Sequence, residues 1–175
     1  MIRLTDDMHN GFRMRLNFIN PHKMIYDIQF IAQTLGKIGR FNNIGNRHMS
    51  VAEHCYHASY LYPDNPLGAL MHDAPEAITG DITTHLKRLL GEAIKEIEHR
   101  IEDDMVSRFN YRVVGGDFKE AVDRPLFYKE EEALFGSDDC HKNNSLPQVR
   151  LYFWDAPTAA VNFLERYYEL KHAQS

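Results

Sequence analysis

The stretch ALMHDAPEAITGD, residues 69–81, carries four titratable side chains, of which the adjacent histidine and aspartate could bind a metal ion. His72 and Asp73 are adjacent in an apolar run, and Glu76 and Asp81 follow closely. Neutral imidazole and carboxylate together suit intermediate divalent ions such as Mn, Fe, Co, Ni or Zn. An isolated His-Asp pair is also typical of a hydrogen-bonded core histidine. The pair therefore predicts a metal site only if further ligands lie near it.

Two helices must position these groups. Ser50 and Glu53 match a capping box, in which the serine side chain accepts an early backbone N–H and the glutamate reaches back to the cap. A helix should begin there and run to about Tyr62. After a short turn, Asn65 is a cap and Pro66 occupies the first helical position, where its missing N–H costs nothing. Such a short connection makes the two helices antiparallel neighbours.

His54 lies in the first of these helices and is the third candidate ligand. Antiparallel packing would let His54 and His72 face each other across the seam between the helices. His57, one turn later, competes with His54 for this role, and His48 is close by in the preceding loop.

Apolar periodicity predicts further helices around this pair. One covers 28–35, with Asp27 as cap and Gly36 as the stop. A long amphipathic helix begins at Gly91, with its apolar stripe continuing to Met105.

The C-terminal third of the chain adds two more helices. Asp117 begins a helix that Pro125 should kink or restart. The segment 136–147 has turn composition, and Asp155 caps a last helix. Short strands are possible only at 12–19 and 149–153. The pattern predicts an all-α fold, a compact bundle in one domain spanning 1–175.

Composition narrows the class of protein. The chain has 175 residues, enough for one domain with a core, and no apolar run near the length of a membrane span. Its N-terminus lacks the hydrophobic block of a signal peptide, so we expect a cytoplasmic protein. Two cysteines, Cys55 and Cys140, are too few for a disulfide framework. A formal charge of −5 argues against broad binding to nucleic acid.

An ordered set of short motifs resembles a known family. The set comprises Arg40-Phe41-Asn42, Ser50-Val51-Ala52-Glu53-His54, His72-Asp73-Ala74-Pro75-Glu76-Ala77, Gly80-Asp81-Ile82, Leu86-Lys87-Arg88, Val122-Asp123 and Glu130. It resembles the HD-domain metal-dependent phosphohydrolases, specifically the small branch of bacterial and phage nucleotide phosphohydrolases. The resemblance covers most of the chain and implies a helical bundle of the HD-domain type. It also implies one divalent metal ion (Mn, Co, Zn, Fe, Ni or Mg) bound by His54, His72, Asp73 and Asp123, with Asp117 as the alternative to Asp123.

Glu76 and Asp81 are the candidate catalytic residues. Glu76 lies one turn after His72 and Asp73, and Asp81 follows Gly80. A phosphoester hydrolase needs groups that manage protons and position water, and the resemblance implies this role for the two carboxylates. Which is the acid and which the base stays open. Pro75 should bend the helix and open space beside the metal.

Five residues are candidates for substrate binding. Arg40 offers a bidentate guanidinium and Lys87 a point charge for phosphate, and Lys119 is a third cation one turn before the fourth ligand. Phe41 and Asn42, next to the arginine, could stack on a base and hydrogen-bond to it.

The leading hypothesis is an enzyme that hydrolyses (deoxy)nucleoside 5′-monophosphates to nucleoside and phosphate. The alternative within the same branch removes triphosphate from a deoxynucleoside triphosphate such as dATP. The alternative of another class is a non-catalytic nucleotide sensor or interaction module. A small-molecule nucleotide is thus the expected partner, without nucleic acid or membrane. The resemblance also implies a homo-oligomer, for which the aromatic segment 163–168 offers an interface, if it does not face the core.

Overall fold

The computed structural model describes residues 17–18, 20–136 and 147–174. Regular structure in these residues is helical, apart from one isolated bridge between Gly39 and Ser50, so the all-α prediction is confirmed. Segment 149–153 forms no strand. Most of the other candidate strand, most of the predicted loop 136–147 and Cys140 lie outside the described residues.

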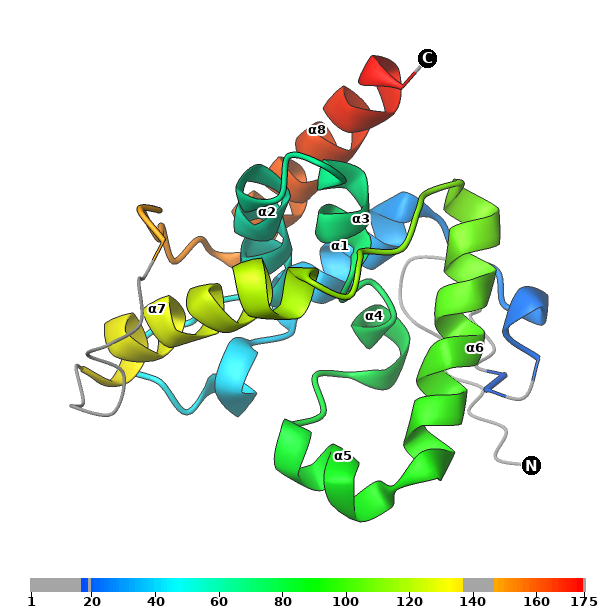
Figure 1. Cartoon of the computed structure of the whole chain (residues 1–175), viewed down its shortest axis with the longest axis horizontal. Coiled ribbons are helices and arrows are strands. Elements are labelled where there is room, and N and C mark those ends of the chain that lie inside the picture. Colours follow the sequence, from blue (N-terminus) through cyan, green and yellow to red (C-terminus); the bar gives the residue numbers. More distant parts are fainter. Residues whose placement is uncertain (1–16, 19, 137–146, 175) are drawn as a thin grey trace.

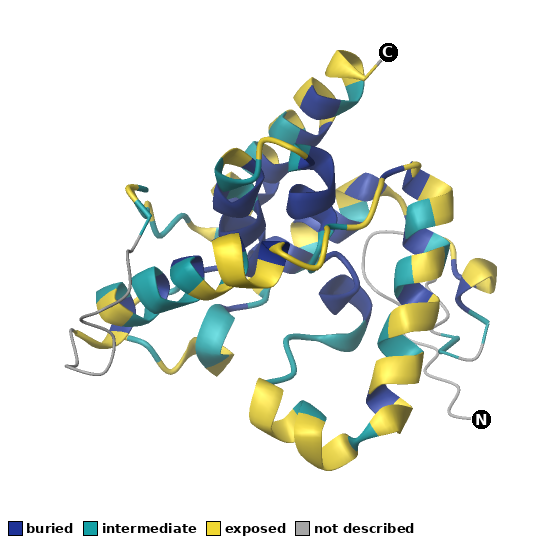
Figure 2. Ribbon diagram, viewed as in Figure 1, coloured by how far each residue is buried: buried dark blue, intermediate teal, exposed yellow. Residues whose placement is uncertain are grey.

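Four helices form the centre of the fold. They are α1 (Ile28–Lys37), α2 (Val51–Leu61), α3 (Pro66–Met71) and α8 (Ala156–Ala173). Helix α8 packs against the other three, and α2 packs against α1 and α3 (Figure 1). Their facing side chains, including Leu35, Leu70 and Phe163, are fully buried, whereas the outer helices are exposed on much of their surface (Figure 2).

Three of the predicted helix caps are present as expected. The side chain of Asp27 accepts the N–H of Phe30, and that of Asp155 accepts the N–H of Thr158. Asn65 caps α3 by accepting from Gly68, with Pro66 in the first turn. Because a cap and its partner are three residues apart, these bonds follow from local sequence.

Gly36 does not end its helix, contrary to prediction. Helix α1 continues to Lys37. A Cβ at position 36 would lie 2.6 Å from the carbonyl oxygen of Ala156, closer than real Cβ contacts allow. The glycine therefore allows α1 to approach the first turn of α8 closely.

Only one of the two hydrogen bonds of the predicted capping box is present at the start of α2. Ser50 Oγ accepts the N–H of Glu53 at 3.1 Å, as predicted. The Glu53 carboxylate instead accepts three backbone N–H groups from a distant segment, those of Tyr152, Phe153 and Trp154, at 2.7–2.9 Å. Glu53 is fully buried and ties α2 to the segment that leads into α8.

Outer helices surround this centre. They are α4 (Glu76–Thr79), α5 (Thr84–Leu90), α6 (Glu92–Phe109), a π-helical turn (Lys119–Asp123) and α7 (Arg124–Phe135), with short 3-10 turns at Pro21–Lys23 and Arg40–Asn43. Pro125 lies in the first turn of α7, so the helix restarts there. Pro75 lies in a break between α3 and α4, where residues 72–75 form turns.

The aromatic segment near the C-terminus faces the core more than the solvent. Phe163 is fully buried and Tyr167 is nearly so, while Tyr168 is 45% exposed. No helix in the described part of the chain has both the length and the apolar character needed to cross a bilayer.

Candidate metal centre

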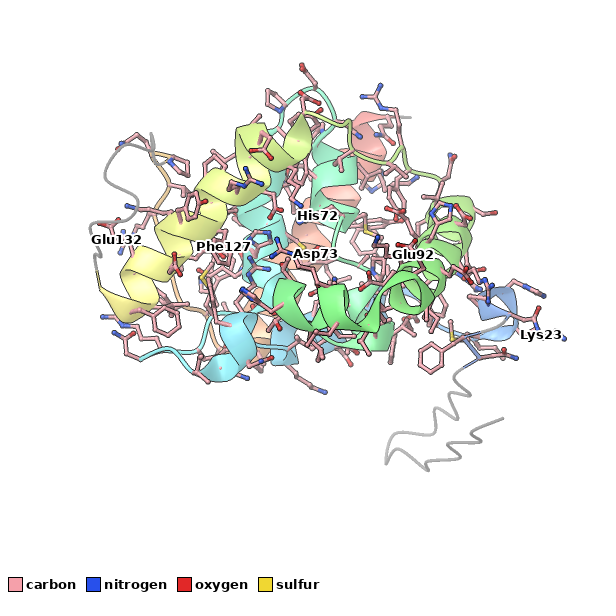
Figure 3. The ribbon with its side chains drawn as sticks, turned by 60° about the horizontal axis from the view of Figure 1, so that its bottom comes forward. Lys23, His72, Asp73, Glu92, Phe127 and Glu132 are labelled. Carbon is pink, nitrogen blue, oxygen red and sulfur yellow. The ribbon has the colours of Figure 1, made fainter. Side chains whose placement is uncertain are left out.

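Three helical segments bring four predicted ligands together. His54 comes from the first half of α2, His72 and Asp73 follow α3, and Asp123 ends the π-helical turn. His54 Nε2 lies 3.3 Å from His72 Nε2 and 3.4 Å from Asp123 Oδ1. Asp73 Oδ2 lies 3.2 Å from His72 Nε2 and 3.8 Å from His54 Nε2. Figure 3 shows His72 and Asp73 in the middle of the molecule, between α7 and the α5–α6 region.

These separations fit ligands of a single ion. Nitrogen and oxygen ligands lie about 2.1 Å from ions such as Zn²⁺, so neighbouring ligand atoms in tetrahedral or octahedral geometry lie roughly 3 to 3.5 Å apart. His54, His72 and Asp123 form a group that could hold a metal ion.

The hydrogen bonds of the two histidines fix their tautomers. His54 Nδ1 donates to Glu130 Oε1 at 2.6 Å, and His72 Nδ1 donates to the carbonyl oxygen of Ala69 at 2.7 Å. Each ring then presents the lone pair of its Nε2 to the other ligands. A second partner that orients an imidazole in this way is typical of metal-binding histidines.

Glu130 and Arg40 form a buried ion pair next to the candidate ligands. Glu130 lies two turns after Asp123 in sequence and is fully buried in α7. Its Oε2 accepts from Arg40 Nε at 3.1 Å, and Arg40 Nη1 lies 3.7 Å from Asp73 Oδ2. Although burial opposes it, the charges of His54 and Arg40 hold the pKa of Glu130 below its ordinary value.

Charge also favours a cation at this position. The carboxylates of Asp73, Asp123 and Glu130 face one guanidinium, that of Arg40, which leaves a formal charge of −2 before any proton or ion binds. A divalent cation would neutralise that charge. Although burial opposes it, Asp73 raises the pKa of His72 well above its ordinary value, as expected where negative charge is in excess.

A second possible ligand group, Cys55 with His72 and Asp73, is less suitable. His72 Nδ1 lies 4.0 Å from Cys55 Sγ, but it is already bonded to a carbonyl oxygen. Burial raises the pKa of the Cys55 thiol, whereas a metal ligand must be a thiolate.

The competing residues lie elsewhere. The His57 ring stacks on Tyr152 and Trp154, away from the ligands. Both His48 nitrogens are engaged outside the centre, with the Asn43 side chain and the Gly36 carbonyl oxygen. Asp117, the alternative to Asp123, accepts a hydrogen bond from the Tyr62 hydroxyl at 2.9 Å and is exposed.

The candidate catalytic groups lie beside the ligands. Glu76 is only 7% exposed and lines a cleft of about 270 Å³ together with His72, Asp73 and Lys87. Its Oε2 is buried and has no hydrogen-bond partner among the described residues. Burial and the charges of Asp73 and Asp81 raise the pKa of Glu76 well above its ordinary value. Asp81 is half-buried just after α4, and burial raises its pKa as well.

The candidate substrate-binding residues are not all in one place. Lys87 Nζ lies 4.0 Å from Glu76 Oε1, at the cleft, and Arg40 is beside Asp73. Phe41 packs against Phe127 and Phe135, which gives its ring a structural contact. The Asn42 and Lys119 side chains are exposed and are not among the residues that line the cleft.

Sequence reasoning assigned no role to two residues of this region. Glu130 had a recognisable signal, because its spacing of seven from Asp123 places both on one helix face. Glu98, which lies 2.8 Å from Lys87 Nζ, had none, since its partner is on another helix.

Comparison with known proteins gives relatives but no activity. No family model matches the chain. It is 34% identical over 110 residues to an uncharacterised protein of Rhodobacter capsulatus, covering 57% of this chain and 56% of the relative. It is 42% identical over 85 residues to the uncharacterised protein YfdR of Escherichia coli K12, covering 48% of this chain and 46% of the relative. The chain thus spans about half the length of the curated relatives it matches.

Proposed function

We propose that this protein is a metal-dependent phosphohydrolase of the HD-domain type that acts on nucleotides, releasing phosphate from (deoxy)nucleoside 5′-monophosphates. The observation that carries the proposal is the convergence of His54 Nε2, His72 Nε2 and Asp73 Oδ2 beside the unpartnered Oε2 of Glu76. A site that only held a metal for stability would not need a buried carboxylate oxygen without a hydrogen-bond partner next to the ligands.

The ion would be held by His54, His72, Asp73 and Asp123, and its native identity is open among Mn, Co, Zn, Fe, Ni and Mg. When bound, a divalent ion neutralises charge on a phosphoryl group and makes water acidic enough to lose a proton near neutral pH. Glu130 orients the His54 ring, and Arg40 limits the negative charge around Asp73.

The protein's own groups then manage the substrate. In the proposed reaction a water oxygen bonds to phosphorus, the ester P–O bond breaks, and the nucleoside oxygen takes up a proton. Glu76 and Asp81 are the groups that hold and transfer protons, since their raised pKa values bring this exchange toward neutral pH. Lys87, 4.0 Å from Glu76, contacts the phosphate oxygens.

Two other functions remain candidates. A triphosphohydrolase would use the same reacting groups on a deoxynucleoside triphosphate. A nucleotide sensor would keep the pocket without turnover. The buried, unpartnered Glu76 favours an enzyme over a sensor, because a binding protein gains nothing from a proton-handling carboxylate there.

The test is a panel of ribo- and deoxynucleoside mono- and triphosphates with Mn²⁺, Co²⁺, Mg²⁺ or Zn²⁺, with products separated by chromatography. We expect orthophosphate from monophosphates. Tripolyphosphate would support the triphosphohydrolase, and the absence of turnover with every ion would support the sensor. His72→Ala should lose both bound metal and turnover, while His172→Ala, exposed near the end of α8, should retain both.

A further inference from the structure

One face of α6 forms a wall of the cleft, opposite the metal ligands. Lys95, Glu98, His99 and Glu102 line the cleft together with Asp73 and Glu76. The spacing of the four α6 residues, 95, 98, 99 and 102, places them on a single helix face. Helix α6 packs against α5 (Figure 1), which carries Lys87, another residue that lines the cleft.

The positive charges in this cleft are already paired. Lys87 Nζ lies 2.8 Å from Glu98 Oε1, and Lys95 Nζ donates to Glu92 Oε1 at 2.7 Å. The wall therefore presents little positive charge that is free to bind an anion.

The negative charges in the cleft outnumber the positive ones. Asp73, Glu76, Glu98 and Glu102 line it, against two lysines, Lys87 and Lys95. Glu76 also has a buried carboxylate oxygen without a hydrogen-bond partner among the described residues. A bound divalent ion would be neutralised largely by its own ligands Asp73 and Asp123, so Glu98 and Glu102 keep the α6 side of the cleft negative, which suits a single phosphoryl group held by the ion and Lys87. A chain of three phosphates would place further negative charge against Glu98 and Glu102.

We propose that Glu98 and Glu102 determine specificity, by excluding a polyphosphate chain from the cleft while a phosphomonoester is accepted. This inference rests on the proposed function and assigns its preference for monophosphates to two residues of α6. Glu98 acts twice, through its own charge and by neutralising Lys87, whereas Glu102 acts through its charge alone.

The experiment measures binding of orthophosphate and of tripolyphosphate by calorimetry, at one fixed free Mn²⁺ concentration. The variants are Glu98→Gln and Glu102→Gln, which keep side-chain shape and remove the charge. In each, the affinity for tripolyphosphate relative to orthophosphate should rise by about threefold to tenfold, the range expected for one partly exposed charge. Because a gain in affinity is predicted, loss of folding cannot imitate it.

Glu96→Gln is the matched control. It removes the same charge from the same helix, but Glu96 is 66% exposed, pairs with Arg100 and does not line the cleft. Its affinity ratio should match that of the wild type. An equal rise in all three variants, or no rise at Glu98 and Glu102, would overturn the proposal.

The same measurements separate this inference from the proposed function. Wild-type protein that hydrolyses monophosphates, with unchanged ratios in both variants, would contradict charge exclusion alone. Protein that shows the expected ratios yet hydrolyses no nucleotide would contradict the proposed function alone. Protein that binds neither anion would contradict both.

Discussion

The candidate metal centre and helix α5 border the same cleft but are held in place very differently. In α2, most residues are buried, including His54 at the centre of the ligand group. In α5, no residue is buried, and Leu89 is 85% exposed. Among the described residues, the closest side-chain contact of α5 is the ion pair between Lys87 and Glu98 of α6.

This difference in burial matches two different requirements of one site, rigid ligands and a substrate-contacting side chain that can change partners. Ligands of an ion must be held to within a fraction of an ångström, which dense packing and buried charge networks achieve. A side chain that contacts the substrate must be able to exchange one anionic partner for another. Lys87, held at the surface of α6 by a half-exposed ion pair, has that freedom, whereas His54 between Glu130 and Asp123 does not.

The largest effect should come from Glu130→Gln. This change removes the charge between His54 and Arg40 and leaves a buried guanidinium poorly compensated, so the free energy of unfolding should fall by about 3 kcal/mol. Metal affinity should fall by about tenfold to a hundredfold, because His54 loses its orienting carboxylate. Urea denaturation with chelator and metal titration measure the two quantities. Glu132→Gln, on the exposed side of α7, should change neither, and equal losses in both variants would refute a rigid centre.

Glu53→Gln should cost somewhat less. The amide can accept fewer of the three backbone N–H groups of residues 152–154, so the free energy of unfolding should fall by about 2 kcal/mol at pH 7. Although burial opposes it, the bonds from His57 and those N–H groups hold the pKa of Glu53 below its ordinary value.

A depressed folded-state pKa contributes stability above the unfolded value, about 4.3 for glutamate, and loses it as the pH falls through the folded value. The stability difference between wild type and Glu53→Gln should therefore be largest near neutral pH and narrow below about pH 4. Denaturation curves of chelator-treated protein between pH 7 and pH 3.5 measure this. A stability difference between wild type and variant that increased as the pH fell would contradict this prediction.

Lys87→Ala should affect function and spare the fold. Loss of a partly exposed ion pair should change the free energy of unfolding by less than about 1 kcal/mol. Under the proposed function, loss of the phosphate contact of Lys87 should raise KM for monophosphates about tenfold or more. Arg88→Ala, its exposed neighbour in α5, is the control for both measurements. A large stability loss in Lys87→Ala alone would show that α5 depends on this pair for its fold.

The smallest effect should come from Leu89→Gln. With 85% of Leu89 exposed, the free energy of unfolding should stay within about 0.5 kcal/mol of the wild type. Thermal denaturation of monomeric protein measures this. A larger loss of the free energy of unfolding would show that Leu89 packs against other residues and would contradict this prediction.

Features that depend on nearby residues could be predicted from the sequence. The caps Asp27, Asn65 and Asp155 and the all-α class follow from local pattern and are present. The short turn before α3 makes α2 and α3 neighbours, which is why His54 and His72 were expected to meet.

Features that depend on distant partners could not be predicted. The local sequence predicts that Glu53 belongs to a capping box. Its carboxylate instead accepts three hydrogen bonds from amides about a hundred residues away, and these replace the single local bond. Gly36 reads as a helix stop because glycine often ends helices, while its actual reason is the backbone of Ala156. The role of Glu98 depends on α5 lying beside α6, which no spacing within either helix encodes.

The contact of Glu53 with residues 152–154 has a consequence for how the protein matures in the cell. Its carboxylate is one residue from His54, and the amides that satisfy it are the last part of this network to leave the ribosome. We expect a nascent chain that stops before Tyr152 to bind metal weakly, since the buried Glu53 carboxylate then keeps only its bond from His57. If the candidate centre binds an ion, that binding would thus be delayed until residues 152–154 have been translated.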